Sequence, residues 1–200
     1  MSAALLVWED ADGAQSLWPG QRLSMMIDDA GAADQLLRLT GEAQLSDDKG
    51  RRISRPSGCR ILPISPSHQL LGQQTLSDNL QLALSLAMGG HLIAPGSREA
   101  LRCEAALSQV QAIVPMPADA YPEHLTPVQQ RAAQWALAWL LPHDVLWLDR
   151  IEQGLTLRER EQMQALANAH QASFPLRAQV HGTLEASVAD RFADRCLFWG

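Results

Sequence analysis

The chain has 200 residues, a length that fits one domain, or one domain with a small lobe, and allows a sizeable buried core. Its formal net charge of −6 argues against a general affinity for nucleic acid, and its longest apolar runs are too short to span a bilayer. The three cysteines lie far apart in the sequence, so we expect reduced thiols and no metal site.

The first part of the chain predicts two strands followed by a loop of small residues and a helix. The strands are Leu5–Trp8 and Arg22–Ile27, with a turn at residues 10–13 between them. Residues 28–34 form the loop, and an amphipathic helix runs through Gln35–Leu39. A strand, a small-residue loop and a helix in this order are the plan of a phosphate-binding P-loop unit.

The middle of the chain predicts a polar hairpin or loop, a buried strand and then a helical region. The hairpin or loop covers residues 42–58, and the strand is Arg60–Ile64. The next helix starts at Leu76, with Ser77 or Asp78 as its N-cap. Glycine and proline pairs interrupt the helical pattern that follows.

The second half alternates helices with strands. Residues 127–141 form the longest clean helix, with Thr126 as its cap and Pro127 in its first turn. The strand Val145–Leu148 leads directly into Asp149. The remaining elements are a helix at Leu157–Asn168, short strands at Leu176–Val180 and Cys196–Trp199, and a helix at residues 183–193 between those strands. This alternation predicts an α/β fold with a mostly parallel sheet flanked by helices.

Four landmarks keep a fixed order in this half. They are the run Leu125–Arg131 that opens a helix, Asp149 after its strand, His181 after a short strand, and the final segment Ala193–Gly200. In order and spacing they resemble the ATPase subunit of an ABC transporter, with its LSGGQ-type helix start, Walker B aspartate, switch histidine and closing strand. The resemblance covers nearly the whole chain and implies a P-loop NTPase-like fold with a small helical lobe.

The residues that would hold phosphate in this family are replaced. Ala33 stands where the resemblance places the P-loop lysine, and Asp34 stands in place of the hydroxyl that binds magnesium. The chain's single lysine, Lys49, lies in a polar turn and is expected to be solvated. Asp28 and Asp29 add two carboxylates to the loop, and two like charges about 4 Å apart repel by roughly 4 kcal/mol at a surface-like dielectric. Such a loop would disfavour the binding of ATP, because its carboxylates would repel the phosphates.

The loop aspartates have a structural alternative. A helix N-terminus favours an anion, so Asp28 or Asp29 would occupy the place of the phosphate and cap the helix from within the chain. The other interpretation is that these side chains simply point into solvent.

At the Walker B position the catalytic base is also replaced. Asp149 ends its strand as the resemblance implies, but Arg150 stands where a glutamate is expected. A guanidinium cannot accept a proton from water, so general-base hydrolysis is lost. We expect Asp149 to be a structural relic rather than a metal ligand, and Arg150 either to pair with Asp149 and the loop aspartates or to point into solvent.

The remaining relics are weaker. Thr126 and Gln129 belong to the LSGGQ-like run, in which proline and valine replace the residues that approach a partner's phosphate. His181 matches the switch histidine, although a lone histidine at a strand end is more often structural. Gln69 is the nearest candidate for the glutamine that couples nucleotide to permease.

These observations predict a single domain with two lobes that has lost nucleotide chemistry. The core lobe is about residues 1–76 and 125–200, and the helical lobe is about residues 77–124. The leading hypothesis is a non-catalytic, ABC-ATPase-like subunit without cofactor that acts by binding other proteins. Its partners would be an integral membrane permease, a second ABC-type ATPase subunit, or a second copy of itself. It would have no span of its own and would lie in the cytoplasm, on the inner face of the membrane.

Two alternatives remain open. One is a weak ATPase or nucleotide sensor that uses arginines in a non-standard phosphate site. The other is a scaffold unrelated to transport. Neither the transported substrate nor the stoichiometry follows from the sequence.

Overall fold

The computed structural model describes residues 3–11, 13–67, 70–193 and 195–199. The chain divides into two compact units. The first contains residues 1–65, 143–151 and 171–200, and the second contains residues 66–142 and 152–170. Each unit is described by itself.

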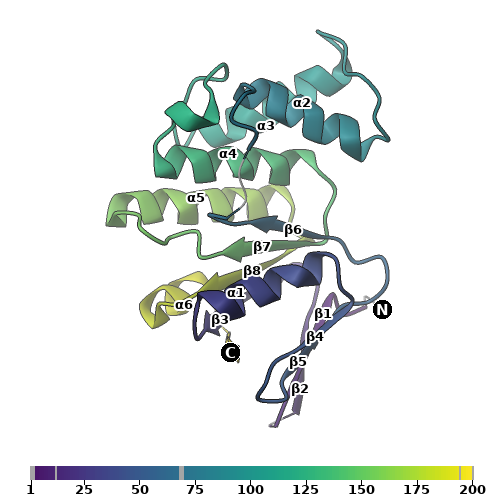
Figure 1. Ribbon diagram of the computed structural model, residues 1–200, viewed down its shortest axis with the longest axis vertical. Helices are drawn as coiled ribbons and strands as arrows, with labels where there is room; N and C mark the ends of the chain where they lie inside the picture. The colour runs from purple at the N-terminus through teal and green to yellow at the C-terminus, as the bar shows by residue number, and fades with distance from the viewer. Residues whose placement is uncertain (1–2, 12, 68–69, 194, 200) are drawn as a thin grey trace. The chain divides into compact units, whose positions relative to one another are not determined.

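The first unit is built on a parallel sheet of five strands in the order β6-β7-β8-β3-β9 (Figure 1). The strands are β3 (Arg22–Ile27), β6 (Ile61–Ile64), β7 (Val145–Asp149), β8 (Ala178–Thr183) and β9 (Cys196–Trp199). All residues of β7 and β8 are buried, as is typical of strands covered on both faces. The α/β fold with a parallel sheet is thereby confirmed.

A second, antiparallel sheet in the same unit has the order β2-β1-β5-β4. Its strands are β1 (Leu6–Asp10), β2 (Gly13–Leu17), β4 (Gln44–Ser46) and β5 (Arg52–Ser54). The hairpin of β4 and β5 confirms the hairpin interpretation of residues 42–58. Strand β2 was not predicted, because its residues are mostly exposed and polar and form a strand through pairing with β1.

Two helices pack in the first unit. Helix α1 (Ala30–Leu37) continues into a short 3-10 turn at Arg38–Thr40, and α6 (Ala186–Phe192) contacts β3 and β8. Helix α1 begins within the segment 28–34 that was predicted to be a loop. The prediction was wrong because alanines, which are strong helix formers, follow a capping aspartate.

The core of the first unit joins its two sheets. Trp8 of β1 packs edge-on against Trp199 of β9 with ring centroids 5.2 Å apart. Met25 and Trp147 belong to the same buried cluster, as does Leu36 of α1. This packing holds the ends of β3 and β7 in fixed places, and the candidate site lies there.

The second unit is helical. It contains α2 (Leu76–Ala87), α3 (Arg98–Gln111), a 3-10 turn at Pro122–His124, α4 (Pro127–Leu140), and α5 (Leu157–Ser173) as far as His170. Trp135 of α4 is fully buried and packs near Trp139 and His170. In the part of the chain that the structure describes, no helix has the length and apolar character needed to cross a membrane.

The N-cap of α2 differs from the prediction. Thr75 is the cap, and Asp78 is the third residue of the helix, whose carboxylate accepts from the Thr75 backbone N–H. Ser77 is helical. The predicted caps lie two and three residues too far along the chain, because Thr, Ser and Asp stand close together here and all three favour helix starts.

Candidate functional site

The candidate site lies at the carboxyl ends of β3 and β7 in the first unit. Only Asp28 and Asp29 connect β3 to α1. The Asp28 backbone N–H donates to the Trp199 carbonyl at 3.0 Å, which ties this connection to β9. Two residues make a tight turn rather than the long glycine-rich loop that wraps a phosphate.

Asp29 is the N-cap of α1. Its backbone is extended, with φ −152° and ψ 178°, and its Oδ1 accepts a hydrogen bond from the Ala32 N–H at 2.8 Å. The Ala33 N–H donates to the Asp29 carbonyl at 3.2 Å. A carboxylate therefore lies at the positive end of the helix dipole, where a phosphate group would otherwise be favourable.

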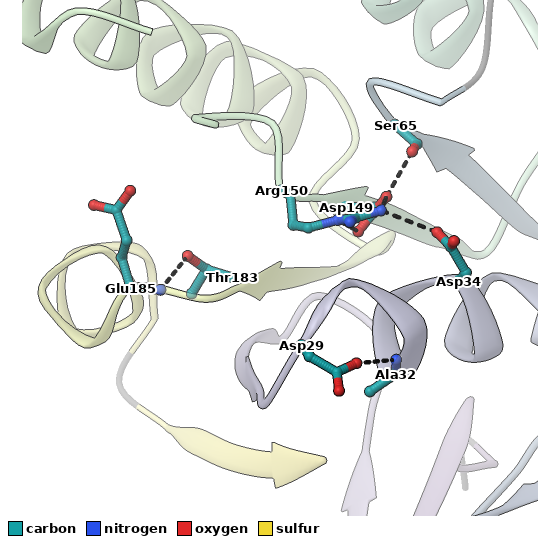
Figure 2. A network of polar contacts seen from close by, with 8 residues as sticks. All are labelled: Asp29, Ala32, Asp34, Ser65, Asp149, Arg150, Thr183 and Glu185. Atoms are coloured by element: carbon teal, nitrogen blue, oxygen red, sulfur yellow. Dashed lines mark hydrogen bonds and ion pairs between the residues drawn. The ribbon is translucent and has the colours of Figure 1, made fainter. Parts of the chain in front are cut away.

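Asp149 and Arg150 form a buried ion pair. Arg150 Nε lies 2.8 Å from Asp149 Oδ1, and Arg150 Nη2 lies 3.0 Å from Asp149 Oδ2, so the guanidinium engages both carboxylate oxygens. Ser65 Oγ donates to Asp149 Oδ2 at 2.5 Å (Figure 2). Asp149 is completely buried. Hydrogen bonds from the guanidinium to Asp149 raise the pKa of Arg150, against the effect of its own burial.

The backbone of Arg150 is unusual. Its φ of 44° lies in the left-handed region, which costs energy for a residue with a side chain. The Arg150 N–H donates to the Gly182 carbonyl at 2.8 Å, which holds this conformation against β8. The turn directs the side chain back over Asp149.

Asp34 and Asp28, the two remaining aspartates between β3 and the middle of α1, also have basic partners. Arg150 Nη2 lies 3.2 Å from Asp34 Oδ1, which joins the first turns of α1 to the end of β7. Asp28 Oδ2 accepts from Lys49 Nζ at 2.9 Å. The side chains of Asp34 and Asp28 are 67% and 52% exposed, so these pairs contribute little stability by themselves.

An apolar contact fills the space beside this network. A Cβ atom added at Gly182 would lie 2.7 Å from Cδ1 of Ile27. The side chain of Ile27 on β3 thus occupies space that is open only because Gly182 on β8 has no side chain.

His181 lies within β8 rather than after it, because this strand extends to Thr183. Its ring is buried and packs on Phe192 of α6 with centroids 4.5 Å apart. Thr183 Oγ1 accepts from the Glu185 N–H at 3.1 Å and so supports the turn into α6. Figure 2 shows this pair on the side of Arg150 away from Asp34.

Thr126 and Gln129 belong to the second unit and form a capping box. Thr126 Oγ1 accepts from the Gln129 N–H at 3.4 Å, and Gln129 Oε1 accepts from the Thr126 N–H at 3.1 Å. Gln129 Nε2 also donates to the Pro115 carbonyl at 2.8 Å. Gln69, the candidate coupling glutamine, lies outside the described residues.

Sequence reasoning did not identify Ser65 or Lys49 as members of the site. Ser65 follows β6 directly, and β6 pairs with β7, so its hydroxyl reaches the aspartate that ends the neighbouring strand. The carboxyl ends of adjacent parallel strands are where polar groups of such sheets converge, and this rule would have pointed to Ser65. Lys49 reaches Asp28 from a loop, and no sequence signal indicates that contact.

No protein-family model matches this chain, and no curated protein matches its sequence. Solved structures do match its fold. An inward-facing protein assigned to the metal-chelate type of ABC transporter aligns with a TM-score of 0.76 and 16% identity, over 98% of this chain and 79% of that chain. The structure of an ATP-binding subunit of an ABC transporter aligns with a TM-score of 0.67 and 17% identity, over 98% and 85%.

A third match is CbiO1 from Clostridium perfringens, part of the ABC transporter complex CbiONQ. It aligns with a TM-score of 0.70 and 15% identity, over 98% of this chain and 84% of that chain. At these identities the likeness concerns the fold alone. The chain has the α/β fold of ABC transporter ATP-binding subunits, and the resemblance predicted from the sequence landmarks is confirmed at that level.

Proposed function

From the fold of an ABC transporter ATP-binding subunit, we propose that this chain is a non-catalytic member of such an assembly, which binds partner proteins and not ATP. One observation carries the proposal. The guanidinium of Arg150 engages both oxygens of Asp149 and one oxygen of Asp34, the two positions where the resemblance places magnesium chemistry.

The residues present do not suit a magnesium–triphosphate complex. Ala33 has no charge to offer a phosphate, and Asp34 would face it with a negative charge. The Ala32 amide already donates to Asp29. A nucleotide would therefore have to displace a carboxylate from the helix start and would meet further carboxylates, and the basic groups nearby, Lys49 and Arg150, are already paired with Asp28, Asp34 and Asp149.

Hydrolysis meets a separate obstacle. The residue after Asp149 is an arginine, whose side chain has only donors and keeps its proton throughout the accessible pH range. It cannot act as general base towards water. The carboxylates at the helix start argue against ATP binding, and the arginine after Asp149 argues against hydrolysis. These two observations support the proposal independently of each other.

The remaining role is to bind proteins. The structural neighbours are described as parts of ABC transporters, so the partner we propose is an integral membrane permease, a second ABC-type ATPase subunit, or both, with a homodimer as the simplest alternative. The chain would then lie on the cytoplasmic face of the membrane. We also propose that the two-lobe division, with a helical lobe at about residues 77–124, applies to this chain.

A cavity of about 330 Å³ in the second unit offers a place for a partner's side chains. Its walls combine prolines with polar side chains: Pro66, Leu70, Gly72, Pro122, Glu123, Pro127, Gln130, Arg131 and Gln134. Gln130 Nε2 donates to the Pro122 and Leu125 carbonyls at 3.0 and 3.2 Å, which fixes one wall. A preformed cavity of this size suits a few side chains of a docked segment.

Isothermal titration of the purified chain with ATP and magnesium tests the first part. We expect no heat of binding up to about 1 mM nucleotide, the weak end of ordinary affinities, and no phosphate release. An ABC ATPase subunit with an intact P-loop is the positive control. Magnesium-dependent binding in the micromolar range would establish the alternative of a weak ATPase.

A pull-down from detergent-solubilised membranes tests the second part. The multi-span protein recovered would be identified, purified and recombined with the chain. We expect Arg131→Glu, in the wall of the cavity, to abolish the complex, whereas Arg158→Glu, on the exposed face of α5, should not. A complex that survives Arg131→Glu would remove the cavity from the proposal.

A further inference from the structure

The last turn of α2 and the connection to α3 expose apolar side chains in the second unit. Residues 79–97, which span this region, contain no Asp, Glu, Lys or Arg. Leu86 is 67% exposed, Met88 39% and Leu92 97%. A side chain as exposed as that of Leu92 projects from a convex surface and does not line a groove. We call Leu86, Met88 and Leu92 the apolar tip.

The turn that ends α2 has a defined backbone path. The Gly90 N–H donates to the Ser85 carbonyl at 2.8 Å, and the Gly89 N–H donates to the Leu86 carbonyl at 3.1 Å. These two bonds make a Schellman motif, which needs a residue in the left-handed region directly after the C-cap. Gly89 has φ +83° and meets this requirement. The chain therefore leaves α2 in one defined direction.

The same turn brings the two leucines of the tip together. Ser85 Oγ donates to the His91 carbonyl at 2.6 Å. Ser85 directly precedes Leu86, and His91 directly precedes Leu92. The two leucines thus start from adjacent points of the backbone, and Met88, the C-cap of α2, lies between them in the chain. The apolar tip is one patch and not three scattered side chains.

Two other exposed leucines show why the surroundings of the tip matter. Leu157 is 62% exposed and directly precedes Arg158. Leu176 is 78% exposed and directly precedes Arg177. A leucine beside a charged residue remains in water, because moving it into an apolar phase would also desolvate the charge. The apolar tip carries no such cost, because residues 79–97 hold no charged neighbour.

We propose that the apolar tip inserts into the interface of a lipid bilayer. A stable protein interface needs roughly 800 Å² and 20–30 residues from each partner, with anchors that fill pockets. The convex tip offers three side chains, too few to hold a second copy of the chain or another protein. A bilayer needs no pocket, accepts a short wedge, and gains free energy from each apolar side chain that leaves water.

Shallow insertion also suits the backbone of this connection. The headgroup region contains water, so the N–H and C=O groups that the turn leaves unbonded keep partners there. Only the side chains of the tip would enter the acyl region. The inference goes beyond the binding of partner proteins, because the contact is with lipid and requires neither a permease nor a nucleotide.

Flotation of the purified chain with vesicles of pure phosphatidylcholine tests the proposal. A single acyl chain binds membranes with a constant of about 10⁴ M⁻¹, and we expect roughly 10³ M⁻¹ for the tip, so about half of the protein should float at about 1 mM lipid. Leu86→Ser/Leu92→Ser should weaken binding at least about tenfold, because each buried leucine is worth about one such factor or more. The control Leu157→Ser/Leu176→Ser removes two similarly exposed leucines and should leave binding unchanged.

Salt and folding provide further checks. Raising the salt concentration from about 0.1 M to about 1 M should not release the protein, because the tip has no charge to screen. Leu92→Ser alone should keep the thermal unfolding midpoint, since this side chain is 97% exposed, and should still weaken binding.

Three results of the flotation would overturn the proposal. They are no binding of the unchanged protein to phosphatidylcholine, binding to anionic vesicles only with release by salt, and an equal loss of binding in the control pair. Self-association in sedimentation that Leu86→Ser/Leu92→Ser abolishes would also overturn it, because the occupant would then be a second copy of the chain.

Discussion

Two helix N-termini in this molecule, those of α1 and α4, correspond by resemblance to places where an ABC ATPase contacts phosphate, and they differ in how their amides are satisfied. At α1 the cap is a carboxylate, Asp29, and a buried ion pair adjoins the helix through Asp34. At α4 the cap is a neutral box of Thr126 and Gln129 with a proline in the first turn.

The difference indicates two routes away from phosphate binding. The start of α4 is an ordinary capping box. Many helices have such a start, and only a few substitutions are needed to produce one. The start of α1 is joined to β7 by the pair of the exposed Asp34 with Arg150, whose guanidinium also engages the buried Asp149. We therefore expect α4 to tolerate substitution and the surroundings of α1 to resist it.

The largest effect should follow Arg150→Ala, which leaves the carboxylate of Asp149 buried without its guanidinium. Removing one member of a buried pair costs about 3–5 kcal/mol, and we expect a loss of this size in the free energy of unfolding measured by urea titration. Arg38→Ala, at a 60% exposed side chain, is the matched control and should change it by less than about 1 kcal/mol. If Arg150→Ala lowers the free energy of unfolding by a similarly small amount, the ion pair with Asp149 does not stabilise the fold as expected.

An intermediate effect is expected for Gly182→Ala, because the added methyl group would overlap Cδ1 of Ile27. Overpacking of this kind costs about 1–3 kcal/mol of unfolding free energy. Ile27→Val removes the atom in question, so the double variant should recover part of that loss in a thermodynamic cycle. Strict additivity of the two single changes would contradict the close contact.

The smallest effects concern the two caps, and they compare the regions directly. Asp29→Ala should cost about 1–2 kcal/mol, since both a cap and a charge at the helix dipole are lost, whereas Thr126→Ala should cost about 0.5–1 kcal/mol. Asp29→Asn keeps the cap and should recover most of the loss. If Thr126→Ala costs as much as Asp29→Ala, the contrast between the helix starts fails.

Local patterns were sufficient for much of the fold. Strands β3 and β9 have the predicted bounds, and α4 ends one residue earlier than predicted. Each has a buried apolar run or a strong cap within its own residues. Strand β2 could not be predicted in this way, because it becomes a strand by pairing with β1, in which Leu6 lies opposite Leu17.

The same distinction applies to the candidate site. Asp29 and Ala32 are three residues apart, and Asp149 and Arg150 are adjacent, so helix-capping rules and charge pairing bring these contacts within reach of sequence reasoning. Ser65 and Asp149 are 84 residues apart, and Lys49 and Asp28 are 21 apart. Such contacts follow from the order of the strands and the path of a loop, which no local pattern specifies.

That Asp149 and Arg150 are consecutive has a further consequence, for the order of folding. A pair of neighbours closes almost no loop, so it can form in a chain whose distant parts have not yet met. The aspartate can then enter the interior with its counter-charge already attached, and β7 can join the sheet before α1 supplies Asp34.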